Sequence, residues 1–189
     1  MSVRYDNATG ATGKPAKGTL EFYGILKLKF PTYNLSHVGI YARRKIRGSS
    51  SRYSLHAEGR AVDLTINIAE PAKSEARKII REWCIANSEK YQIQEIIDYK
   101  NSQIWTSNRA KDGWRKYTGQ GSGTLGHLHI GQNRIGAKLE GNIKFDKIET
   151  VKAEGAEIVQ NIKENFTIST LIVVVTLYII IGSLAVSIF

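Results

Sequence analysis

The pattern of apolar and polar positions predicts one strand and one helix in the middle of the chain. Apolar residues alternate with polar ones from Ala61 to Ile68, which is typical of a half-buried strand, and Asp63 lies on it. After Pro71, the segment SEARKIIREWCIANSEK (74–90) has apolar residues at helical spacing, and a proline close to the start favours a helix. Cys84 lies on the apolar face of this helix, so we interpret it as a core residue.

Shorter apolar segments predict the rest of a folded domain. Three of them are expected to be strands, namely IQEIIDY (93–99), SQIWTS (102–107) and GHLHIG (126–131). The segment TLEFYGILKLKF (19–30) is expected to form a strand or an ordered segment that leads into the domain. The polar, Gly-rich residues 1–18 predict a flexible tail. Together these elements indicate a mixed α+β domain over residues 19–136.

The C-terminal segment 166–189 has a different pattern, because its 24 residues include no charged side chain. A helix of about 20 apolar residues spans a bilayer, so we predict one transmembrane helix here. The alternative, a buried core helix, would usually show a polar stripe. Residues 1–18 lack the apolar region of a signal peptide, so we expect the protein to be anchored by its C-terminal helix.

The connector, residues 137–165, has apolar positions three, four and seven residues apart. This spacing predicts an amphipathic helix, which Gly155 interrupts. Such a helix suits a stalk, a membrane-surface element, a self-association segment or a helix packed on its own domain.

Charge and composition narrow the classes of partner and of metal site. The chain has 27 Lys and Arg against 17 Asp and Glu, a net charge of +10, and the excess lies in residues 1–136 because the connector is nearly neutral. Polyanionic partners are therefore expected, and nucleic acid, anionic lipid and bacterial cell wall all qualify. With 42% hydrophobic residues and 3 prolines, the chain is neither disordered nor collagen-like. Its single cysteine excludes a disulfide framework and a multi-cysteine zinc site, so a metal would need His and carboxylate ligands.

Two segments carry residues of that kind, SLHAEGRAVDL (54–64) and HLH (127–129). A catalytic zinc takes three protein ligands and leaves one position for water. His56, Asp63 and His129 could supply that set.

Local geometry supports this convergence. On an extended strand, His127 and His129 point to the same face while Leu128 packs inward, so one imidazole could bind metal while the other does chemistry. Gly59 would permit a tight turn that lets His56 approach the strand.

The two segments resemble the zinc peptidases of the lysostaphin, D-Ala-D-Ala metallopeptidase and hedgehog group, particularly carboxypeptidase-like and phage endolysin-like members. The motif S-x-H-x-x-G-R-A-x-D and the later HxH carry the resemblance, and further segments follow in the family's order from Gly39 through Gly131. The resemblance implies a small antiparallel sheet with flanking helices and a bound Zn²⁺. It assigns His56, Asp63 and His129 as ligands and His127 as the histidine that stabilises the reacting centre.

The resemblance also implies a substrate-holding arginine upstream of the first ligand. Arg44 is our first choice, with Arg43 and Arg47 as alternatives, and a solvated basic loop is the other interpretation. Many carboxypeptidase-like members have a glutamate as general base three residues before the last ligand, where this chain has Gly126. His127 would then take the proton, as in the glutamate-free branch of the group.

Further side chains are candidates for the same site or its surroundings. Glu58 is expected to face solvent, and Asp98 is a further candidate base. Trp105, Trp114 and Tyr117 lie in a basic, aromatic stretch. They are interpreted as a groove wall for the peptide stem and glycan, with nucleobase stacking or simple core packing as the alternatives.

The leading hypothesis is a membrane-anchored zinc metallopeptidase that hydrolyses peptide bonds in bacterial peptidoglycan. Its membrane would be a bacterial inner membrane or the internal membrane of a bacteriophage, in which case it is a virion-associated lysin. The alternatives are a membrane-tethered nucleic-acid-binding protein and a wall-binding structural protein on a catalytically inactive peptidase fold. The positive charge fits all three, but the nucleic-acid hypothesis leaves the His and Asp set unexplained.

Overall fold

The computed structural model describes residues 3–46 and 48–139. The predicted transmembrane helix (166–189), nearly all of the connector (137–165) and Arg47 lie outside the described residues. Within these two described ranges, none of the helices is both long enough and apolar enough to cross a membrane.

The centre of the fold is a six-stranded sheet in which every neighbouring pair of strands is antiparallel. The strand order is β1-β2-β6-β3-β4-β5. The strands are β1 (Leu35–Gly39), β2 (Ala61–Ile66), β3 (Ile93–Asp98), β4 (Gln103–Thr106), β5 (Arg115–Lys116) and β6 (Leu128–Gln132). Strands β2, β3, β4 and β6 fall where the apolar pattern predicts strands. The α+β class and the antiparallel sheet are confirmed.

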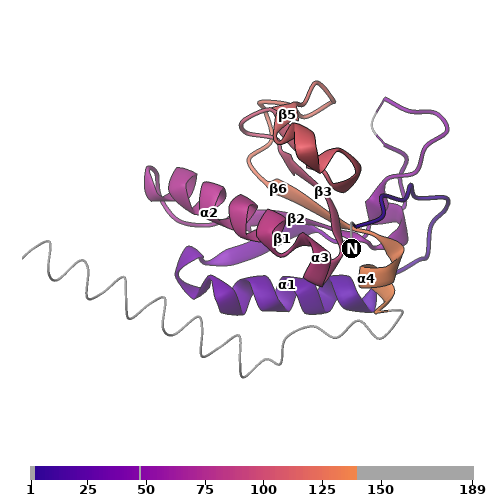
Figure 1. Cartoon of the computed structure of the whole chain (residues 1–189), viewed down its shortest axis with the longest axis horizontal. Helices are drawn as coiled ribbons and strands as arrows, with labels where there is room; N and C mark the ends of the chain where they lie inside the picture. Colours follow the sequence, from indigo (N-terminus) through magenta and orange to yellow (C-terminus); the bar gives the residue numbers. More distant parts are fainter. Residues whose placement is uncertain (1–2, 47, 140–189) are drawn as a thin grey trace, which may run out of the picture.

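The described part of the chain also contains helices that flank the sheet (Figure 1). They are α1 (Lys17–Lys29), α2 (Ala72–Ala86), α3 (Ser88–Tyr91) and α4 (Arg134–Lys138), with 3₁₀ turns η1 (Pro31–Tyr33), η2 (Leu55–Glu58) and η3 (Ser107–Asp112). Helices α2 and α3 occupy the predicted helical segment, and Cys84 of α2 is fully buried in the core, as predicted.

Residues 19–30 were expected to form a strand or an ordered segment leading into the domain, but nearly all of them lie in helix α1. The buried side chains Phe22, Ile25 and Leu26 are three and four residues apart, which is the spacing of one helical face. The helix contacts β1 and β2, and its last turn carries two lysines, which suit the negative end of the helix dipole.

Alternation along the strands separates the core from the functional face. Val62 and Leu64 of β2 and Leu128 of β6 are fully buried in the core that α1 and α2 complete. Their intervening neighbours, Asp63 and His129, therefore point to the opposite face of the sheet. Helices α1 and α2 thus cover one face of the sheet, and Asp63 and His129 lie on the second face.

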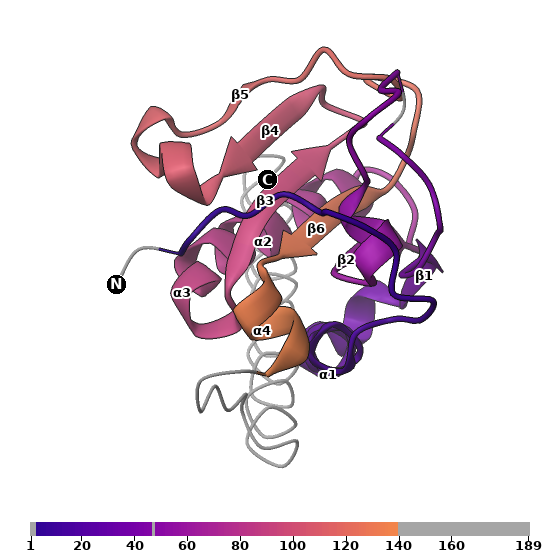
Figure 2. The ribbon, with the colours of Figure 1, turned by 90° about the vertical axis from the view of Figure 1, so that its right-hand side faces the viewer.

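Residues 3–16 lie against that second face and are not the predicted flexible tail. In Figure 2 the indigo segment passes over β3 and β6. Ala8 is buried and forms an isolated antiparallel bridge with Tyr53. The backbone N–H of Thr12 donates to the carbonyl of Ala57 at 2.8 Å. The segment is part of the domain because its backbone groups find hydrogen-bond partners there.

Candidate metal centre

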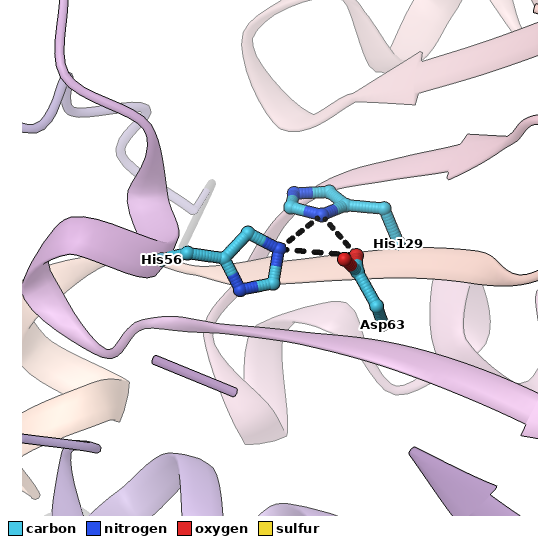
Figure 3. A group of neighbouring side chains, drawn as sticks. All are labelled: His56, Asp63 and His129. Atoms are coloured by element: carbon cyan, nitrogen blue, oxygen red, sulfur yellow. Dashed lines mark hydrogen bonds and ion pairs between the residues drawn. The ribbon is translucent and has the colours of Figure 1, made fainter. Parts of the chain in front are cut away.

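Three side chains from three elements converge on the second face of the sheet (Figure 3). His56 comes from η2, Asp63 from β2 and His129 from β6, and the β2–β6 register places Asp63 directly opposite His129. Nε2 of His56 lies 3.0 Å from Oδ1 of Asp63 and 3.1 Å from Nδ1 of His129. The third distance, from Nδ1 of His129 to Oδ1 of Asp63, is 2.9 Å. The structure thus brings the three candidate ligands together, with one donor atom from each.

The short turn η2 delivers His56 to the strands. The side chain of Ser54 caps this turn by accepting from the backbone N–H of His56 at 3.4 Å. Gly59 ends the turn with a φ of 66°, in the left-handed region that favours glycine. A Cβ at Gly59 would lie 2.5 Å from the carbonyl oxygen of Lys14, so the N-terminal segment also requires glycine here. The tight turn expected between His56 and Asp63 is present.

Hydrogen bonds at the far ring nitrogens fix how the two imidazoles face the centre. Nδ1–H of His56 donates to the carbonyl of Ile40 at 3.2 Å, and Nε2–H of His129 donates to Oε1 of Glu95 at 3.0 Å. A carbonyl and a carboxylate only accept, so the inward nitrogens of the neutral rings keep an unshared pair. Together with Oδ1 of Asp63 they form a group of three acceptors, which requires a cation.

The pKa values of the group agree with this requirement. Burial opposes ionisation of Asp63, yet its interactions with His129 and His56 hold its pKa well below its usual range. Burial likewise opposes protonation of His129, but its hydrogen bonds to Asp63 and Glu95 raise its pKa to about 9. A proton on His129 is the cation when no metal is present. Two imidazole nitrogens and one carboxylate oxygen also fit a divalent cation, because ligand atoms of tetrahedral zinc lie about 3.3 Å apart.

His127 lies beside the group without joining it. Its Nε2 is 3.6 Å from Oδ2 of Asp63, the oxygen that does not face the other two histidines. The ring packs edge-on against Tyr99, with centroids 4.9 Å apart, and Tyr99 packs in the same way against Tyr117 at 5.5 Å. The side chain of His127 is 14% exposed, against 5% for His129. His127 is thus the more accessible imidazole.

A pocket of about 260 Å³ opens over these residues. Its walls include Asp63, His127 and His129, together with the predicted substrate contacts Arg44 and Tyr117. The walls come from strands β2, β3, β4 and β6, together with the N-terminal segment, the loop that precedes η2 and the segment that precedes β6.

The two predicted tryptophans do not line this pocket. Trp105 is 3% exposed and belongs to the hydrophobic core. Trp114 packs against the core, and the guanidinium of Arg81 lies 3.9 Å from its ring centroid. These positions correct the groove-wall interpretation of both tryptophans and agree with the core-packing alternative. Arg43 is exposed, and Arg47 lies outside the described residues.

Glu95 was missed by the sequence analysis. Its side chain is 12% exposed, lines the pocket, and accepts from His129 and from the hydroxyl of Tyr5, the latter at 2.7 Å. Burial opposes ionisation of Glu95, but these hydrogen bonds lower its pKa. Burial and the charge of Glu95 raise the pKa of Tyr5, so its hydroxyl keeps the proton that it donates. The only signal in the sequence was a carboxylate within an apolar strand.

Glu58 does not face solvent, contrary to expectation. Its side chain is 8% exposed and pairs with Nε of Arg60 at 2.7 Å and with a guanidinium nitrogen of Arg134 at 2.8 Å. Burial opposes its ionisation, but hydrogen bonds from Arg134 and the backbone of Thr9 lower its pKa to about 2. Glu58 therefore links the N-terminal segment to the end of the domain and is not a candidate base.

Asp98 is also committed to structure. It is fully buried, with Oδ2 2.6 Å from a guanidinium nitrogen of Arg81 and Oδ1 3.4 Å from one of Arg77. Arg77 also donates to the carbonyl of Gly126 at 2.7 Å, directly before His127. This network connects α2 to the segment that precedes β6, which we call the β6 lead-in.

The family described as VldE, C-terminal domain, matches residues 13–128, which include His56, Asp63 and His127. No curated protein and no solved structure matches the chain. Since the family match spans more than half of the chain, this protein belongs to the VldE C-terminal domain family.

Proposed function

We propose that the domain is a zinc-dependent peptidase that hydrolyses peptide bonds in bacterial peptidoglycan. The observation that carries this proposal is the convergence of His56, Asp63 and His129 beside a pocket that is lined by Asp63, His129 and His127. Two imidazoles and one carboxylate suit zinc, and such a set leaves a coordination position open. The resemblance to the lysostaphin, D-Ala-D-Ala metallopeptidase and hedgehog group supports the same reaction and a fold of that type.

When bound, zinc would lower the pKa of a water molecule and polarise the scissile carbonyl. The protein's own contribution begins with the far nitrogens of His56 and His129, whose hydrogen bonds hold both rings in one tautomer. His127 takes the proton at its ring nitrogen and later returns it to the leaving amine. Its position beside Asp63 and its exposure to the pocket suit that exchange.

Arg44 and Tyr117 are the pocket residues proposed to bind the substrate. Peptidoglycan is an anionic polymer, and the guanidinium of Arg44 would pair with a carboxylate of the stem peptide. Tyr117, packed against Tyr99, would form an apolar wall for the peptide chain.

The proposed location is a membrane, with residues 166–189 as a single C-terminal anchor. The absence of any charged residue in that segment supports it. The membrane would be a bacterial inner membrane or the internal membrane of a bacteriophage, where the protein would open the wall during infection.

The test is mass spectrometry of the muropeptides released from purified sacculi by the full chain in mild detergent. We expect release that a chelator abolishes and that added Zn²⁺ restores, and the new termini will identify the bond. The matched control is His127→Ala, whose release should fall by about 100-fold or more while it still holds zinc.

If a folded, zinc-loaded protein releases no fragment, the peptidase proposal fails. Binding to sacculi without cleavage would then favour the wall-binding protein. A steep salt dependence of DNA affinity, with no affinity for sacculi, would favour the nucleic-acid-binding protein.

A further inference from the structure

A chain of two hydrogen bonds leads from the candidate ligand His129 to the N-terminal segment. Oε1 of Glu95 accepts from Nε2–H of His129 at 3.0 Å. Oε2 of the same carboxylate accepts from the hydroxyl of Tyr5 at 2.7 Å. Each oxygen of Glu95 thus serves one partner, and the two partners are 124 positions apart in the sequence.

The backbone around Tyr5 is held firmly enough to orient that hydroxyl. The backbone N–H of Asp6 donates to Oε1 of Gln94 at 3.0 Å, and Nε2 of Gln94 donates back to the carbonyl of Asp6 at 3.0 Å. Oδ1 of Asp6 pairs with the guanidinium of Arg60 at 2.8 Å. The side chains of Gln94 and Arg60 are buried, so these contacts are shielded from water.

Glu95 itself lies on the rigid central part of the sheet. It is on β3, and its backbone pairs with Gly131 of β6 and Thr106 of β4. The side chain of Glu95 also packs closely against Gly131, because a Cβ at that glycine would lie 3.0 Å from Cγ of Glu95. A carboxylate held in this way restricts the rotation of the imidazole that it contacts.

We propose that Glu95 and Tyr5 are positioning residues for the metal ligand His129, so that the N-terminal segment is part of the metal centre. The inference rests on the metal site of the proposed function and deepens it. Removing the carboxylate contact frees the ring of His129, and removing the Tyr5 hydroxyl lets Glu95 turn away from it. Any event that lifts the N-terminal segment from the sheet would therefore weaken metal binding.

The experiment measures zinc affinity of the full chain by competition with a chromophoric chelator, without peptidoglycan. We expect Glu95→Gln to weaken zinc binding by about 10- to 100-fold, the usual effect of losing an outer partner of a ligand. Tyr5→Phe removes a single hydroxyl and should weaken it by roughly three- to tenfold. The double variant should bind zinc no more weakly than Glu95→Gln alone, because Tyr5 acts through Glu95.

The matched control is Tyr41→Phe. Tyr41 accepts from the backbone N–H of Gly13 at 3.1 Å, so this variant removes another hydroxyl contact to the N-terminal segment without touching Glu95. We expect wild-type zinc affinity in this control. Thermal unfolding of each metal-free variant shows whether the fold is kept.

Wild-type zinc affinity in Tyr5→Phe, or a double variant whose loss equals the product of the two single losses, would overturn the inference. An equal loss in Tyr41→Phe would also overturn it, because general loosening of the segment would then be the cause. A wild-type chain that binds no zinc would instead refute the metal centre itself, which separates this failure from failure of the positioning roles.

Discussion

His127 and His129 lie two residues apart and make different contacts with the same carboxylate. Nδ1 of His129 faces Oδ1 of Asp63 within the acceptor group, whereas Nε2 of His127 faces Oδ2 from the pocket side. His129 lies on β6, whereas His127 lies in the segment just before Leu128 and is the more exposed of the two. At this scale the sequence could indicate the residue types and their common face. It could not indicate which ring nitrogen points inward, because Ile40 and Glu95 determine that from elsewhere in the chain.

These contacts predict a division of labour between the two histidines. We expect His129→Ala to abolish stoichiometric zinc binding, because it removes one of three ligands. His127→Ala should keep zinc and lose turnover of peptidoglycan by about 100-fold or more, the usual contribution of a general base. Zinc content by elemental analysis and muropeptide release are the two measurements. Equal zinc loss in both variants would contradict the assignment.

The raised pKa of His129 predicts how zinc affinity depends on pH. Its pKa is about 9 in the metal-free protein, so below that pH zinc must displace a proton to bind. The apparent association constant should therefore rise about tenfold per pH unit and level off near the pKa of His129. Competition titrations between pH 6 and pH 8, corrected for protonation of the competing chelator, measure the slope. A flat profile would show that His129 is already neutral in this range.

At the scale of elements, β2, β6 and η2 carry the candidate ligands, and α2 is hydrogen-bonded to the segment that precedes β6. The alternation of residues 61–68 and the helical spacing of 74–90 were sufficient to predict β2 and α2, because each places its large apolar side chains on one face. In the structure α2 buries that face, whereas β2 is buried along nearly its whole length. The helix at residues 19–30 was harder to predict, because its apolar face becomes evident only once the sheet that covers it is known. The network through Asp98 was not visible at all, since it joins side chains of α2 to a backbone carbonyl.

This network predicts that Arg77 affects turnover without affecting zinc. Arg77→Lys keeps the charge beside Asp98 but loses the guanidinium nitrogen that donates to Gly126. The lead-in should shift and displace His127, which we expect to lower kcat by roughly tenfold with zinc stoichiometry unchanged. The control is Arg81→Lys, because Arg81 also pairs with Asp98, while the hydrogen bond to the carbonyl of Gly126 comes from Arg77. An equal loss in both variants would point to general destabilisation of α2.

At the scale of the whole domain, contacts between distant parts of the chain complete the site. Tyr5 reaches Glu95 across 90 positions, and Arg134 reaches Glu58 across 76. Such contacts depend on the fold and leave no local pattern, so a polar N-terminal stretch was predicted as a tail and Glu58 as solvent-exposed. The candidate ligands were easier to predict, because His56 and Asp63 lie seven positions apart and only His129 is distant in the sequence.

The separation of the ligands predicts that zinc stabilises the whole domain. His56 and His129 are 73 positions apart, so the three ligands approach one another only in the folded chain and the unfolded chain offers no comparable site. Free zinc at 100 times its dissociation constant should add about 2.7 kcal/mol to the free energy of unfolding. The midpoint of thermal unfolding, followed by tryptophan fluorescence, should rise with zinc concentration in the wild type. It should not rise in His129→Ala, and an equal rise in that variant would mean that zinc binds elsewhere on the folded chain.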